Sequence, residues 1–109
     1  MKLHSILFGG AALIITTTAY ATELPVYDPS AYCENLSTVS GGSATIKNQC
    51  IAMEQSSYNN LKQSWESIPG KTQTYCQNLA RTAGNSYTML ENCIQMESSA
   101  LKAPPKFQF

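Results

Sequence analysis

Residues 32–56 read YCENLSTVSGGSATIKNQCIAMEQS, and residues 75–99 read YCQNLARTAGNSYTMLENCIQMESS. Twelve of the 25 aligned positions are identical, and the two stretches lie 43 residues apart. The identities include both cysteines of each stretch and the Gly-x-Ser between them. A repeat of this length usually indicates one supersecondary element built twice and packed on itself. We therefore expect two copies of one small unit.

The first copy has the start and stop signals of two helices. Asp28-Pro29 is a helix start, with Asp28 as N-cap and Pro29 at the first helical position, where its missing N–H costs nothing. Gly41-Gly42 ends this helix, and Ser43 caps the next one, which Pro69-Gly70 stops. Apolar residues at helical spacing mark the expected inward face of the second helix: Ile46, Cys50, Met53, Leu61 and Trp65.

The second copy repeats this pattern. It starts near Thr72, breaks at Gly84-Asn85, restarts at Ser86 and runs to about Leu101. Its expected apolar face is Met89, Cys93 and Met96. The sequence thus predicts an all-α domain over residues 22–102, with one hairpin over about 28–67 and a second over about 71–102. We expect them to pack as a small four-helix bundle-like domain, followed by a flexible tail over 103–109.

The four cysteines fit a disulfide framework with one bond in each hairpin. Folding the chain at the glycine breaks places Cys33 beside Cys50 and Cys76 beside Cys93, and symmetry favours this pairing among the three that four cysteines allow. Each bond closes a loop of about 18 residues, worth about 3 kcal/mol by the chain-entropy estimate. Structural zinc prefers cysteines in close pairs. The wide spacing here predicts no metal site, and we expect no cofactor.

The first 21 residues have the pattern of a secretory signal. A short basic start at Lys2 and His4 precedes the apolar run Ile6–Thr18, and Ala19-Tyr20-Ala21 provides a cleavage site. Cleavage leaves 88 residues, with no expected membrane span, in a periplasmic or secreted location. It also leaves six basic residues against seven acidic ones, with no cluster of either sign. Nucleic acid is therefore not an expected partner.

Little catalytic chemistry remains in the exported chain. His4 is the only histidine and leaves with the signal, so no Ser-His or Cys-His pair can form. The repeated Glu54 and Glu97 are the one candidate pair for acid and base catalysis, as in a glycosidase. We favour a structural role, because Glu54 is expected across from about residue 29 and Glu97 across from about residue 72. There each carboxylate would cap the first turn of a helix. With Asp28, Ser43 and Ser86, they form the predicted set of capping residues.

The motif Tyr-Cys-x7-Gly-x-Ser-x6-Cys-Ile-x-Met-Glu, present at residues 32–54 and 75–97, resembles small exported proteins of Gram-negative bacteria. This resemblance implies export and paired helices. The chain is also similar to mitochondrial helical hairpins with twin cysteine pairs. Those proteins carry two cysteines on each helix and two bonds in each hairpin, whereas one bond is expected in each hairpin here.

These features together predict a non-enzymatic protein-interaction module of the bacterial envelope. An inhibitor or immunity protein is the sharper form of this hypothesis, since a rigid disulfide scaffold lowers the entropic cost of binding. The expected partner is another envelope or secreted protein, and the sequence leaves the oligomeric state open. One alternative is a periplasmic stress chaperone, triggered by carboxylate protonation below about pH 5. The other is a hydrolase that uses Glu54 and Glu97 alone.

Overall fold

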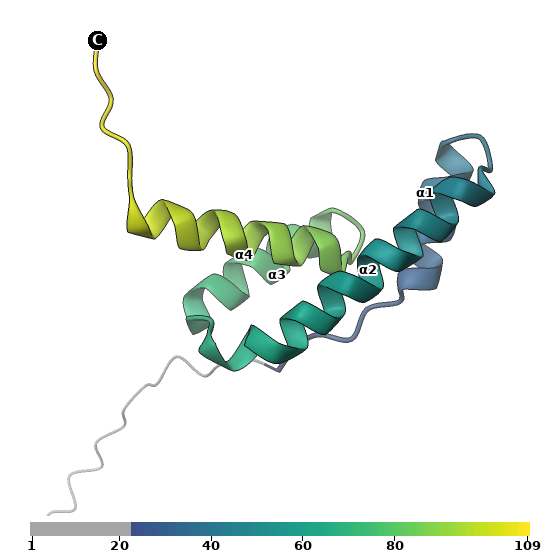
Figure 1. The fold of residues 1–109 in the computed structure, drawn as a ribbon, viewed down its shortest axis with the longest axis horizontal. Helices are drawn as coiled ribbons and strands as arrows, with labels where there is room; N and C mark the ends of the chain where they lie inside the picture. The colour runs from purple at the N-terminus through teal and green to yellow at the C-terminus, as the bar shows by residue number, and fades with distance from the viewer. Residues whose placement is uncertain (1–22) are drawn as a thin grey trace, which may run out of the picture.

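The computed structural model describes residues 23–109 and shows an all-helical chain (Figure 1). The elements are α1 (Pro29–Val39), α2 (Ala44–Ser64), the 3₁₀ turn η1 (Trp65–Ser67), α3 (Gly70–Thr82) and α4 (Tyr87–Lys102). No strand occurs within residues 23–109. The predicted all-α fold is therefore confirmed, whereas the predicted signal over residues 1–21 lies outside the described residues.

Polar side chains begin three of the helices. Asp28, Ser43 and Ser86 are the N-caps of α1, α2 and α4. Each side-chain oxygen accepts a hydrogen bond from the backbone N–H three residues further on, at 3.1–3.2 Å. Such a bond satisfies one of the first-turn N–H groups that a helix leaves without a partner. Helix α3 begins after Pro69 and has no side-chain cap.

The two helical turns share one backbone shape. Gly41 and Gly42 have φ angles of +86° and +78°, and Gly84 and Asn85 have +96° and +66°. The N–H of the second residue in each pair donates to the carbonyl five residues earlier, at 2.7 Å in the first turn and 2.8 Å in the second. This pattern of left-handed residues closes many helix C-termini. The two hairpin tips therefore present the following serine cap in the same way.

One disulfide joins the helices of each hairpin. Cys33 bonds Cys50 and Cys76 bonds Cys93, with Cα–Cα distances of 5.6 and 5.5 Å. The predicted pairing is confirmed. Two disulfides in a chain of this size are typical of oxidising compartments outside the cytoplasm. In the part of the chain that the structure describes, no helix is both long and apolar enough to cross a membrane.

The apolar core lies at one end of the molecule, where α4 crosses the second half of α2 and α3 packs on α4 (Figure 1). Helix α1 packs on the first half of α2 at the other end. Helix α1 and the first half of α2 contribute only the disulfide, Cys33 and Cys50, to the buried apolar residues, whereas Leu61 near the end of α2 belongs to the core. The buried core cluster consists of Leu61, Trp65, Ile68, Cys76, Ala80, Tyr87, Leu90 and Ile94.

Of the face expected inside on the second helix, Cys50, Leu61 and Trp65 are buried, whereas the buried face of α4 is rotated by about one residue from the expected one. Met53 and Met96, expected inside, are 57% and 72% exposed. Glu54 and Ser57 are buried on α2 beside the expected Cys50 and Leu61. On α4 the buried residues are Tyr87, Leu90 and Ile94. The reason is that α2 and α4 bury their faces against each other. Helical spacing alone does not specify which neighbouring helix covers a stripe.

Candidate functional site

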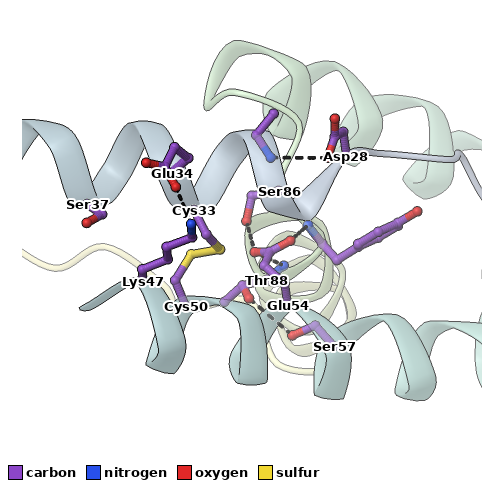
Figure 2. Close-up of a disulfide and its surroundings, with 12 residues drawn as sticks. Asp28, Cys33, Glu34, Ser37, Lys47, Cys50, Glu54, Ser57, Ser86 and Thr88 are labelled. Atoms are coloured by element: carbon purple, nitrogen blue, oxygen red, sulfur yellow. Dashed lines mark hydrogen bonds and ion pairs between the residues drawn. A yellow bond between two sulfur atoms is a disulfide. The ribbon is translucent and has the colours of Figure 1, made fainter. Parts of the chain in front are cut away.

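The carboxylate of Glu54 is sealed between the two hairpins. It is 1% exposed and accepts three hydrogen bonds from the start of α4. The donors are the Ser86 hydroxyl at 2.5 Å, the Tyr87 N–H at 2.7 Å and the Thr88 N–H at 3.2 Å. Figure 2 shows Glu54 reaching from α2 to Ser86 and Thr88 beside the Cys33–Cys50 bond. The negative charge faces the positive end of the α4 dipole, which is a stabilising arrangement.

Glu54 therefore caps a helix, although not the helix that we expected. The sequence placed it near residue 29, at the start of α1. That helix has few donors to offer, because Pro29 has no N–H and Asp28 already accepts from the N–H of Ala31. In contrast, the N–H groups of Tyr87 and Thr88 are free to bond Glu54. The prediction of the capped helix was wrong, and the consequence is that Glu54 ties the first hairpin to the second.

Two further contacts surround this cap. Ser57, one turn after Glu54 and also buried, has its hydroxyl oxygen 3.1 Å from a carboxylate oxygen of Glu91 on α4. On α1, the Tyr32 ring lies against the second turn, so close that a Cβ atom at Gly84 would sit 3.4 Å from it. The tip of the second hairpin is thus held by both helices of the first.

Tyr87 anchors the same tip in the core. It is 3% exposed, its hydroxyl donates to the Pro25 carbonyl at 2.8 Å, and it accepts from the Tyr27 N–H at 2.8 Å. Its ring centroid lies 4.7 Å from that of Tyr27 and 5.0 Å from that of Tyr58. Burial raises the pKa of both Tyr87 and Tyr27. Sequence analysis missed Tyr87, although a signal existed: a bulky aromatic residue stands where the first copy has Ala44.

An open groove runs between α3 and α4 on the second hairpin. Its volume is about 350 Å³. Met96 is 72% exposed there, and Tyr75, Leu79 and Met89 are each about half exposed. Most of the lining is apolar, and no segment of residues 23–109 fills it. The lining residues that bear on binding are Tyr75, Leu79, Met89, Cys93, Met96 and Glu97.

Glu97 belongs to this open groove and has no partner like that of Glu54. It is partly buried on α4, but it accepts no hydrogen bond from the residues that the structure describes. The expected cap near residue 72 is therefore not formed. Glu54 and Glu97 also line different grooves, so the structure does not bring the two carboxylates together at one site.

Metal binding finds no support within residues 23–109. No group of three or more histidine, cysteine, aspartate or glutamate side chains is placed there to hold an ion, and all four cysteines are in disulfides. The features that bear on function are the buried cap at Glu54, the anchored tip at Tyr87 and the open groove with Glu97.

Comparisons with protein-family models, with curated proteins and with solved structures find no match to this chain.

Proposed function

We propose that this protein is a small exported, non-enzymatic module that binds a protein segment in the groove between α3 and α4. The observation that carries the proposal is the exposure of four large apolar side chains around one groove: Tyr75, Leu79, Met89 and Met96. Contiguous exposed apolar surface on a small protein often marks a binding site. Methionine adapts to irregular partners, and tyrosine is enriched at protein interfaces.

The groove has the rigidity that a binding surface needs. The Cys76–Cys93 bond joins its two walls, and Cys76 is itself fully buried in the core. A preorganised surface loses little conformational freedom on binding, so more of the contact energy appears as affinity. The partner in this proposal is a protein segment in the same periplasmic or extracellular space. It presents a small apolar surface together with a hydrogen-bond donor for Glu97.

The non-enzymatic part of the proposal is supported by the state of the two carboxylates. Glu54 is buried, and three donors occupy its oxygens, so a substrate cannot reach it. Glu97 lines the other groove. A glycosidase-type mechanism requires two carboxylates that flank one bond. The arrangement here instead suits a structural acid at Glu54 and a recognition acid at Glu97.

The proposal is tested by photo-crosslinking in an exporting bacterium. A photoreactive amino acid at Met96, in the groove, is compared with the same residue at Glu66, which is exposed on η1. We expect a discrete protein adduct from position 96 and none from position 66. Neither side chain lies in the core, so both variants should retain both disulfides. The absence of an adduct at position 96, or the same adducts at both positions, would refute the proposal.

A further inference from the structure

The two hairpins carry the same groove in two different states. The groove of the first hairpin is lined by Tyr32, Leu36, Cys50, Met53 and Glu54. Each of these positions recurs 43 residues later in the open groove, as Tyr75, Leu79, Cys93, Met96 and Glu97. The first groove has a volume of about 80 Å³ and the second about 350 Å³. The first is small because Thr88, at the tip of the second hairpin, closes it.

The occupant of the first groove is a short tip with defined chemistry. Its two left-handed turn residues are followed by Ser86, which donates its hydroxyl to Glu54, and by two residues that donate their backbone N–H groups. None of these three donors depends on an unusual side chain. Any tip with the same backbone shape and a serine cap provides them.

The tip of the first hairpin has that shape and that serine. Gly41 and Gly42 have positive φ, and Ser43 is the N-cap of α2. The N–H groups of Ala44 and Thr45 donate to no acceptor within residues 23–109. The tip is exposed and lies at the end of the molecule opposite the end of α4 (Figure 1).

We propose that the open groove binds the first-hairpin tip of a second copy of this chain. Glu97 of one molecule accepts from the Ser43 hydroxyl and from the N–H groups of Ala44 and Thr45 of the next, as Glu54 does within the chain. The negative carboxylate again meets the positive end of a helix dipole. The tip and the groove are different surfaces at separate places on the molecule, so the contact is head-to-tail and links molecules into chains or closed rings.

Contact between two molecules is expected to be weaker than its counterpart inside the chain. Ala44 stands where the internal tip has the buried anchor Tyr87, and Lys47 stands where it has Leu90. Lys47 is already paired with Glu34. The internal contact also gains from the covalent connection, which gives it a high effective concentration. Assembly should therefore be reversible and depend on protein concentration.

Sedimentation velocity of the oxidised protein over a wide concentration range tests this inference, which depends on the proposed groove. The average mass of the wild type should rise with concentration. Glu97→Gln removes the acceptor charge, and Ala44→Pro removes one donor at the first helical position, where proline is favoured. Each should weaken assembly at least about tenfold, the effect expected for a lost charge-assisted hydrogen bond. Glu66→Gln, at an exposed acid on η1 outside the contact, should assemble as the wild type does.

Mixing the two variants gives the sharper result. Glu97→Gln keeps a working tip, and Ala44→Pro keeps a working groove. An equimolar mixture should therefore form heterodimers that grow no further, because the remaining tip and groove are both defective. A far-ultraviolet spectrum and a thermal unfolding curve confirm that each variant is folded.

Other outcomes overturn this inference without overturning the proposed function. If the wild type stays monomeric at every concentration while Met96 crosslinks to a different protein, self-assembly is refuted and the groove function stands. If both variants assemble as the wild type does, the contact through Glu97 is refuted. If Met96 crosslinks to nothing and the protein remains monomeric, both proposals are refuted.

Discussion

The two hairpins have the same disulfide spacing but depend on it in different ways. Both bonds join cysteines 17 residues apart. The second hairpin packs Leu90 and Ile94 into the core of the molecule close to its disulfide. Around the Cys33–Cys50 bond, by contrast, α1 exposes Leu36 and Val39, and the core residue Leu61 lies near the far end of α2. In α1 and the first half of α2, the disulfide itself is the buried apolar material. One local design can therefore be supported by packing in one copy and by a covalent bond in the other.

The hairpins also differ in what covers their grooves. The groove of the first is filled by the tip of the second, and Glu54 is buried at the contact. The groove of the second is open, and Glu97 has no partner among the described residues. Residues at equivalent positions of the repeat are thus structural in one hairpin and available for binding in the other. This difference makes matched pairs of substitutions informative.

The largest contrast is expected between two leucines. Leu90 is fully buried in the core, so Leu90→Ala should lower the free energy of unfolding by about 3–5 kcal/mol. Leu36→Ala removes the same atoms from an exposed position on the first hairpin, and its cost should be below about 1 kcal/mol. Urea unfolding followed by circular dichroism measures both. Equal losses would show that α1 packs into an apolar core, which the structure does not have at Leu36.

Removing each disulfide should separate local from global stability. Cys33→Ser/Cys50→Ser and Cys76→Ser/Cys93→Ser each remove a loop closure worth about 3 kcal/mol by the chain-entropy estimate. In the first variant we expect rapid amide exchange confined to α1 and the start of α2, because little else holds them together. The second variant should lose stability throughout, because Cys76 lies in the core.

Hydrogen exchange measured by mass spectrometry distinguishes these two outcomes. The predicted difference between the hairpins is refuted if loss of the Cys33–Cys50 bond speeds amide exchange in α3 and α4 as much as in α1. In that case the two hairpins would unfold as one cooperative unit, and the first would not be the separately stapled element described above.

The two glutamates provide the next contrast. Glu54→Gln replaces a buried acceptor of three hydrogen bonds with an amide whose N–H₂ group faces donors, so it should cost about 2 kcal/mol. Glu97→Gln changes a residue without a partner in the described chain, and its effect on unfolding should be within about 0.5 kcal/mol. Thermal and urea unfolding measure the pair. A large loss for Glu97→Gln would mean that this carboxylate has a structural role in the free protein.

Much of the local structure could be predicted from the sequence because its causes are local. Asp28, Ser43 and Ser86 bond N–H groups three residues away. The residues of a single helical turn are therefore enough to predict each N-cap. The disulfide pairing follows from the distance of each cysteine from a glycine turn. Neither prediction requires knowledge of how the two hairpins sit on each other.

The remaining features depend on contacts between hairpins, which no local pattern specifies. Glu54 was recognised as a capping residue, but the helix it caps is 33 residues away in the sequence. Met53 and Met96 were expected inside because they share a helical face with the cysteines. They are outside because α2 and α4 bury neighbouring faces against each other. Helical periodicity identifies an apolar stripe but not the element that covers it.

The smallest expected effect concerns the N-terminal segment, which contacts the tip of the second hairpin through tyrosines. Burial raises the pKa of Tyr27 and Tyr87 above the usual value of about 10. The unfolded chain therefore loses these protons first as the pH rises. Stability should be unaffected by these groups below about pH 10 and should fall above it, by at most about 1.4 kcal/mol per pH unit for each proton.

Two substitutions identify which tyrosine is responsible. Tyr87→Phe should reduce the alkaline slope and also lower stability at neutral pH by about 1 kcal/mol, because it loses the hydrogen bonds to Pro25 and Tyr27. Tyr27→Phe should reduce the slope while leaving both of those bonds in place. Urea unfolding at several pH values between neutral and strongly alkaline measures the slopes. If both variants keep the wild-type slope, these tyrosines ionise equally easily in the folded and unfolded chains. The contact between the N-terminal segment and the second tip would then not be closed to water.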